Sequence, residues 1–167
     1  MNIYSIILAI FFLPNGTDVC TCAPNGNWRK ATPKEYENVE DVFIGDVTIL
    51  ENNSDYEIVV CEVFKGELKS GQSIKGENLR YCGPNVNKNG QWVLFGNYST
   101  TFLVNDCGLS SSITEPFGMY PPPPPPKKNS DVDRKELIAK WKSELKSESK
   151  KNIQKQINML RNISKSK

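Results

Sequence analysis

The sequence predicts a mainly β protein built around a small closed barrel. Short segments rich in β-branched and aromatic residues recur at fairly regular spacing, with turn residues between them, and only one brief helix interrupts them. The predicted strands cover residues 41–50, 56–64, 72–76, 91–96 and 100–104. Five strands make a five-stranded barrel the economical arrangement. Alternation alone does not separate that barrel from a sandwich.

The individual strands carry different patterns. Residues 41–50 (DVFIGDVTIL) have Gly45 in their middle, which predicts a bulge or bend. The strongest alternating strand covers 56–64, whereas 72–76 is weaker. The segment 91–96 (QWVLFG) is apolar on both faces, so we expect it to be central in the sheet.

The one helix predicted before the strands begins near Thr32 and ends near Val39. Thr32 is placed at the N-cap, Pro33 at the first helical position and Glu35 at the third, which is the pattern of a capping box. Residues 25–34 are otherwise expected to form a loop.

A proline-rich spacer over residues 114–129 separates the barrel from the C-terminal tail. Its six consecutive prolines, Pro121–Pro126, have no backbone N–H to donate and predict an extended polyproline II rod. Such a rod serves as a stiff spacer, or alternatively docks in an aromatic groove.

The tail, residues 130–167, has a helical composition with Ser130 as its candidate N-cap. Two apolar stripes at helical spacing are separated by Ser147-Glu148-Ser149, so one helix and two helical pieces are equally compatible with the pattern. The stripes are Ile138, Trp141, Leu145 and Ile153, Ile157, Leu160. The tail either packs on its own domain, stays in solvent, or binds an anionic surface.

Charge and composition narrow the function classes. The 167 residues carry a net charge of +2, but residues 127–167 hold 13 of the 21 basic residues and only 5 of the 19 acidic ones. An acidic body is therefore followed by a basic tail. Histidine is absent, which removes the usual general base and the commonest metal ligand. We expect no enzyme, no cofactor, no specific nucleic-acid partner and a monomer.

The N-terminus predicts export. Residues 3–13 (IYSIILAIFFL) form an apolar run too short to span a bilayer, which is typical of a secretory signal peptide over residues 1–19. Cleavage after Gly16 or Val19 is compatible with the sequence, and a retained hydrophobic anchor is the alternative. Export places the protein outside the cytoplasm, where disulfides persist.

Five cysteines set the framework of the domain. Cys20 and Cys22 are one residue apart, point to opposite sides of an extended strand, and so each need a distant partner. Cys82 and Cys107 are the available candidates. The odd one is Cys61, expected as a buried strand residue; a reactive thiol is the sharper alternative, but Glu57 and Glu62 disfavour a thiolate.

These cysteines, in their contexts, carry a resemblance to a known family. Cys20-Thr21-Cys22-Ala23-Pro24 resembles the opening of the mature tissue inhibitors of metalloproteinases. The similarity extends in order over about residues 20–113, the netrin-like domain of that family. It continues through Val42-Phe43-Ile44-Gly45, Phe64-Lys65-Gly66, Tyr81-Cys82-Gly83, Trp92-Val93-Leu94-Phe95-Gly96 and Asp106-Cys107.

The resemblance implies an OB-fold and the disulfides Cys20–Cys82 and Cys22–Cys107, each worth roughly 4 kcal/mol by loop-closure arithmetic. It also implies an activity. The α-amino nitrogen and carbonyl oxygen of Cys20 would chelate the catalytic zinc of a metalloproteinase in trans, at the position that such a zinc keeps open. Thr21 would enter the specificity pocket, with Arg80 and Tyr81 flanking the contact.

Chelation requires a chain that begins at Cys20. Any other N-terminus places the amine in a peptide bond. Netrin-like domains also occur as plain binding modules, so a non-inhibitory secreted binding or surface module is the alternative.

Overall fold

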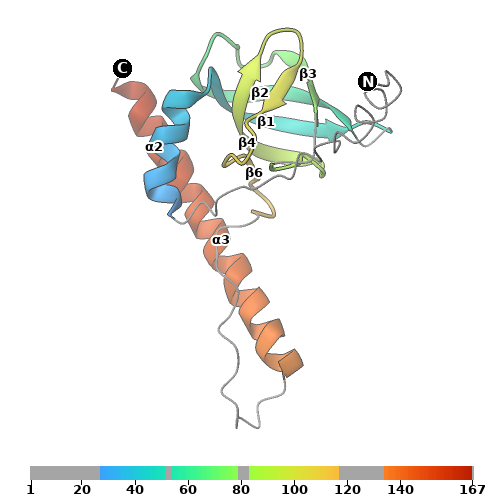
Figure 1. Ribbon diagram of the computed structural model, residues 1–167, viewed down its shortest axis with the longest axis vertical. Coiled ribbons are helices and arrows are strands. Elements are labelled where there is room, and N and C mark those ends of the chain that lie inside the picture. The colour runs from blue at the N-terminus through green and yellow to red at the C-terminus, as the bar shows by residue number, and fades with distance from the viewer. Residues whose placement is uncertain (1–26, 52–53, 79–82, 117–133, 167) are drawn as a thin grey trace, which may run out of the picture.

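A computed structural model describes residues 27–51, 54–78, 83–116 and 134–166. In these ranges a short helix, α2, precedes six strands, and a long helix, α3, follows them (Figure 1). The elements are α2 Trp28–Asn38, β1 Asp41–Ile49, β2 Asp55–Lys65, β3 Ser73–Glu77, β4 Gly90–Tyr98, β5 Phe102–Val104, β6 Ser111–Ser112 and α3 Arg134–Lys165.

Five of the strands close into a barrel, as the sequence predicts. The sheet runs β1-β2-β3-β5-β4, and β1 pairs with β4 to complete the ring. Only β3 and β5 are parallel; the other pairs are antiparallel. The sixth strand, β6, adds to β4 outside the ring through Trp92 and Val93. Because the sheet closes on itself, the sandwich alternative is wrong.

The barrel interior is filled by aromatic and branched side chains. Phe43 meets Phe102 edge-on, with ring centroids 5.0 Å apart. The predicted bulge at Gly45 is confirmed, because the β1–β2 register shifts between Ile44 and Gly45. A Cβ at Gly45 would lie 2.3 Å from Ile58 Cγ2, so any larger residue there would have to displace the core. The interior cluster contains Phe43, Val47, Tyr56, Ile58, Val60, Leu68, Ile74, Val86, Trp92, Leu94 and Phe102.

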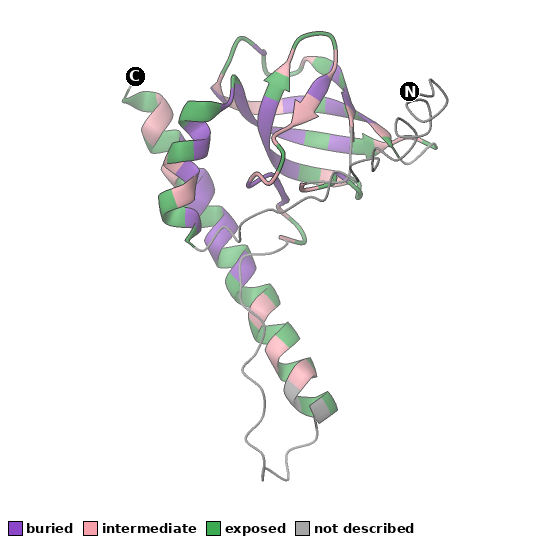
Figure 2. Cartoon of the chain, viewed as in Figure 1, coloured by how far each residue is buried: buried purple, intermediate pink, exposed green. Residues whose placement is uncertain are grey.

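A second cluster lies on the outer surface of β1 and β4. Alternate residues of these strands point outward yet are buried, because α2 and the C-terminal half of α3 cover them (Figure 2). This explains why the β4 sequence is apolar on both faces. The outer cluster contains Tyr36, Val39, Val42, Ile44, Phe64, Val93, Phe95, Leu109, Ile153, Ile157 and Leu160.

Helix α2 begins earlier than the sequence predicts. Its N-cap is Asn27, whose side-chain oxygen accepts a hydrogen bond from the backbone N–H of Arg29 (3.0 Å). The predicted N-cap, Thr32, is instead buried inside the helix, where its hydroxyl donates to the carbonyl oxygen of Trp28 (2.7 Å). Pro33 therefore lies within the helix rather than at its first position.

The C-terminal end of α2 is held to the barrel by Lys65 of β2. The ammonium donates to the carbonyl oxygens of Tyr36 (2.8 Å) and Glu37 (3.2 Å), and also to that of Val39. A cation at this position satisfies orphan carbonyls and matches the negative end of the helix dipole. The Tyr36 hydroxyl donates to the carbonyl oxygen of Phe64 (2.8 Å) and ties the same helix to β2.

Helix α3 is continuous through Ser147–Ser149, so the tail forms one helix and not two. Its C-terminal half packs on the body: Gln156 donates to the Thr32 hydroxyl of α2 (3.0 Å), and Arg161 forms a bidentate pair with Glu62 of β2 (both 2.8 Å). The N-terminal half extends beyond the barrel (Figure 1). No described helix is long and apolar enough to cross a membrane.

Cys61 is a free cysteine, as predicted. It is half-buried rather than fully buried, and it packs against the outer cluster. Its sulfur lies 3.5 Å from the carbonyl oxygen of Val59. The predicted signal peptide, the proline run and the predicted Ser130 cap lie outside the described residues.

Candidate functional site

Most of the predicted contact residues lie outside the described part of the chain, whereas the segments that flank them lie within it. Cys20, Thr21, Cys22, Arg80, Tyr81 and Cys82 are not described. Cys107 is described and is disulfide-bonded; its partner is not among the described residues. The site is therefore built from the segments on either side of residues 79–82 and around Cys107.

Cys107 occupies a tight turn after β5. Its backbone has φ 56°, a left-handed conformation that is uncommon for a residue other than glycine. The turn is closed by a hydrogen bond from the N–H of Gly108 to the carbonyl oxygen of Asn105 (3.1 Å). The N–H of Asn105 donates to the carbonyl oxygen of Phe95 in β4 (2.9 Å), which ties the turn to the barrel.

The carboxylate of Glu35 locks this turn to α2. Both of its oxygens accept from the N–H of Leu109 (2.9 and 2.8 Å), and one accepts from the side-chain amide of Asn105 (3.3 Å). Gly108 is required here, since a Cβ would lie 2.7 Å from the backbone carbonyl oxygen of Asn105 as well as 2.2 Å from Glu35 Oε1. Burial raises the pKa of Glu35 above its ordinary value, while the hydrogen bonds from Leu109 and Asn105 oppose the shift.

The role of Glu35 differs from the one the sequence suggested. The prediction placed its side chain in the capping box of α2, but it reaches across to another loop. The sequence contains a signal for this contact between Glu35 and the loop after Cys107. Glu35 falls on the helical face that also carries Trp28, Thr32 and Val39, all buried, and a carboxylate at a buried helical position needs specific donors.

Gly83 brings the segment after Cys82 against the Cys107 turn. It has φ 123°, and a Cβ there would lie 3.2 Å from the backbone nitrogen of Cys107 and 3.3 Å from Asp106 Cα. The residue next to Cys82 is thus in contact with the turn that holds Cys107.

The flanks of residues 79–82 are also anchored. Asn78, directly after β3, donates from its side-chain amide to the carbonyl oxygen of Val86 (2.9 Å), and its side-chain oxygen accepts from the N–H of Val86 (2.9 Å). Val86 is fully buried in the barrel interior. The described segments on both sides of residues 79–82 are therefore attached to the barrel.

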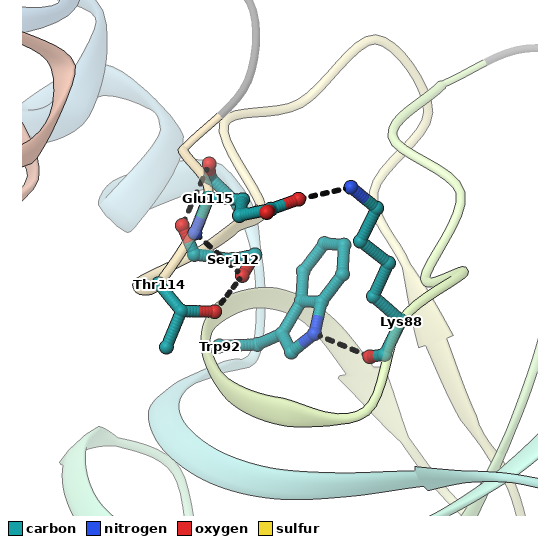
Figure 3. Close-up of polar contacts among 6 residues, drawn as sticks. Lys88, Trp92, Ser112, Thr114 and Glu115 are labelled. Carbon is teal, nitrogen blue, oxygen red and sulfur yellow. Dashed lines mark hydrogen bonds and ion pairs between the residues drawn. The ribbon is translucent and has the colours of Figure 1, made fainter. Parts of the chain in front are cut away.

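Polar contacts around Trp92 fix the neighbouring loop (Figure 3). The indole N–H of Trp92 donates to the carbonyl oxygen of Lys88 (2.9 Å), and the Lys88 ammonium pairs with Glu115. The hydroxyl of Ser112 accepts from the N–H of Glu115 (3.2 Å) and lies 3.1 Å from the Thr114 hydroxyl. The Lys88 ammonium holds the pKa of Glu115 below its ordinary value.

The exposed outer face of β1–β2–β3 carries no aromatic side chain among its described, exposed positions. Some OB-folds bind oligonucleotides on this face, and single-stranded ligands stack on aromatic side chains. Among the described residues, the exposed positions here are charged, polar or aliphatic, and none is aromatic. They are Asp46, Thr48, Glu57, Val59, Ser73 and Lys75.

The described ranges contain no group of three His, Cys, Asp or Glu side chains that could hold a metal ion. The sequence matches no protein-family model, and no curated protein matches it.

Proposed function

We propose that this protein is an exported inhibitor of zinc metalloproteinases, in which the α-amine and carbonyl of Cys20 chelate the protease zinc. The observation that carries the proposal is the contact of Gly83 with the Cys107 turn. It supports a Cys20–Cys22 segment held by disulfides to Cys82 and Cys107, which is the framework that the resemblance implies.

The distances are compatible with both bridges. Cys20 and Cys22 are two residues apart, about 7 Å in an extended chain, and a disulfide joins Cα atoms that are at most about 7 Å apart. The two partners must therefore lie within about 20 Å of each other. A residue adjacent to Cys82 in contact with Cys107 satisfies this limit with room to spare.

Helix α2 restrains the Cys20–Cys22 segment from the C-terminal side of that segment. Glu35 contacts the residues that follow Cys107, and the first residue of α2 is seven positions earlier, about 10 Å along the helix axis. The five residues from Cys22 to Asn27 span at most about 18 Å. Cys22 can therefore reach Cys107 while α2 stays docked.

This anchoring has a consequence for affinity. A bidentate ligand gains most when its donor atoms are held in place before binding, since less conformational freedom is lost in the complex. Two disulfides to a rigid turn and to an anchored loop provide such preorganisation. The free amine and carbonyl of Cys20 then fill the open zinc position and displace the attacking water.

The test compares two N-termini. The mature mass and N-terminal residue of the exported chain are determined first, and a chain beginning at Cys20 is then titrated against a panel of zinc metalloproteinases. A matched chain with one alanine before Cys20 has the same barrel but no free cysteine amine. We expect the first to inhibit and the second to be at least about 100-fold weaker, as expected for the loss of a metal-ligand contact.

Two results would contradict the mechanism. One is equal inhibition by the two chains, which would separate inhibition from the Cys20 amine. The other is no inhibition by the Cys20 chain of any enzyme in the panel, with circular dichroism showing both chains folded.

A second candidate function is a non-inhibitory binding or surface module. The observation that favours it is the half of α3 that extends beyond the barrel and carries basic residues (Figure 1). In that case the disulfides serve stability alone. Retention of the signal peptide, or a mature chain that begins at Thr17, would favour this candidate over the inhibitor.

A further inference from the structure

Burial divides α3 into two halves. From Ser149 to Leu160 the helix has buried side chains on one face, and these pack against α2 and the outer surface of β1 and β4. From residue 135 to residue 148 none of the described side chains is buried (Figure 2). We call residues 134–148 the free half of α3.

The free half carries an apolar stripe with a basic edge. Ile138, Trp141 and Leu145 are three and four residues apart, so they share one face, and each is only half-buried. Exposed lysines follow the edge of this stripe at intervals of seven and four residues. They are Lys135, Lys142 and Lys146.

The charge of this region is positive against an acidic body. Residues 134–148 contain five basic and three acidic residues, while residues 1–126 contain 8 basic and 14 acidic residues. The free half spans about 22 Å, whereas electrostatic screening at physiological salt acts over about 8 Å. A surface that meets the far end of the free half is therefore screened from the acidic body, whereas Lys146 lies close enough to Glu115 to help lower the pKa of that carboxyl.

The apolar stripe and the lysines together indicate which kind of partner the free half of α3 binds. A soluble polyanion would pair with the lysines but leave Ile138, Trp141 and Leu145 in water. A second copy would bring lysine edges together, and three half-buried side chains per copy bury far less than the roughly 1,200 Å² of a stable interface. A tryptophan with aliphatic and lysine neighbours is instead typical of a helix at the boundary of a lipid bilayer.

We propose that the free half of α3 binds an anionic lipid surface. Ile138, Trp141 and Leu145 enter the boundary between headgroups and acyl chains, and Lys135, Lys142 and Lys146 contact the lipid phosphates. The docked half of α3 and α2 hold the barrel to this anchor, so binding would place the barrel next to a membrane. The proposal is independent of the inhibitor mechanism, because it uses neither Cys20 nor the disulfides.

Trp141 gives a direct readout. The other two tryptophans, Trp28 and Trp92, are 6% and 4% exposed, so a change in solvent contact on binding falls mainly on Trp141. The full exported chain is titrated with vesicles of phosphatidylcholine alone and of phosphatidylcholine with phosphatidylglycerol in equal parts. We expect a blue shift and protection from iodide quenching with the anionic vesicles only.

Two triple variants test the residues. Lys135→Glu, Lys142→Glu and Lys146→Glu together should weaken vesicle binding by more than about 100-fold, because each basic residue near an anionic surface contributes about 1 kcal/mol. The matched control reverses three exposed lysines elsewhere, Lys34, Lys69 and Lys75. It makes the same change in net charge and should bind like the unmodified chain. Circular dichroism checks that both variants stay folded.

Four outcomes would overturn the proposal: equal binding to neutral vesicles, equal weakening by both triple variants, no vesicle binding at all, and Trp141 already protected from iodide without lipid. The last would mean that the stripe is covered by the protein's own chain or by a second copy, and sedimentation separates these. Binding to heparin without binding to vesicles would assign the lysines to a polyanion instead.

Discussion

The two sides of the barrel differ in how their outer surfaces meet the surroundings. At Val42 and Ile44 of β1 and at Val93 and Phe95 of β4, the outward side chains are apolar and lie under α2 and the docked half of α3. On β2 and β3 the outward-facing side chains are exposed to solvent; they are Glu57, Val59, Ser73 and Lys75. One closed sheet therefore has a covered side and a bare side. The cysteine turn and its Glu35 lock belong to the covered side.

This difference indicates the structural role of α2 and α3. A closed barrel needs only its interior to be apolar, and the bare side follows that rule by alternation. The covered side has a second apolar layer, which would be exposed without the helices. The helices therefore stabilise the same side that positions the candidate site, and weakening them should matter more than any change on the bare side.

The largest effect is expected from Leu160→Ala. Leu160 is fully buried in the outer cluster, so truncation leaves a cavity and should lower the free energy of unfolding by about 3 kcal/mol. Leu145→Ala makes the same chemical change in the free half, where it should cost less than about 0.5 kcal/mol. Urea denaturation measures both. Equal losses would contradict the division of α3 into a docked and a free half.

Lys65→Met should have the next largest effect. It leaves the carbonyl oxygens at the end of α2 without their cation, and we expect a loss of about 2 kcal/mol in the free energy of unfolding. Lys75→Met on the bare side is the control and should change stability by less than about 0.5 kcal/mol. If the two variants behave alike in thermal unfolding, the cap of α2 does not stabilise the fold.

Glu35→Gln should have the smallest effect, and it should appear as a change in pH dependence. Burial raises the folded-state pKa of Glu35 above its ordinary value of 4.5. The folded protein therefore binds this proton more tightly than the unfolded chain. This favourable contribution is complete below about pH 4 and is lost as pH rises through the folded-state pKa.

The Glu35→Gln variant should lack this pH-dependent contribution to the free energy of unfolding. Denaturation midpoints of both proteins between pH 4 and pH 7 measure it, and the difference between them should change in favour of the variant as pH rises. Glu57→Gln, on the bare side, is the control. A pH profile of Glu35→Gln that parallels the unmodified protein would contradict the assignment of a raised pKa to this carboxyl.

Much of the barrel could be predicted from the sequence because its signals are local. The strands are runs of β-branched and aromatic residues between turn residues, and all five predicted ones are present with ends within two residues. The apolar character of 91–96 on both faces also predicted a central strand. The closure of the sheet and the parallel β3–β5 pair are long-range, and alternation does not encode them.

The features that the sequence did not predict have identifiable physical causes. The pair Thr32-Pro33 imitates a helix start, yet Asn27 caps the helix and Thr32 is buried within it. Strand β6 is two serines, which have no strand propensity and pair because β4 lies beside them. Which stripe of α3 docks depends on the outer surface of the barrel, since both stripes have helical spacing. The contact of Gly83 with Cys107, on which the candidate site depends, is likewise tertiary.

The proposed inhibitor requires that the Cys20–Cys22 segment be held to the barrel at two neighbouring points. Peptide mapping of the non-reduced exported protein by mass spectrometry tests it most directly. We expect Cys20 linked to Cys82, Cys22 linked to Cys107, and Cys61 alkylated as a free thiol. A direct Cys82–Cys107 bridge, or any bridge that includes Cys61, would contradict it.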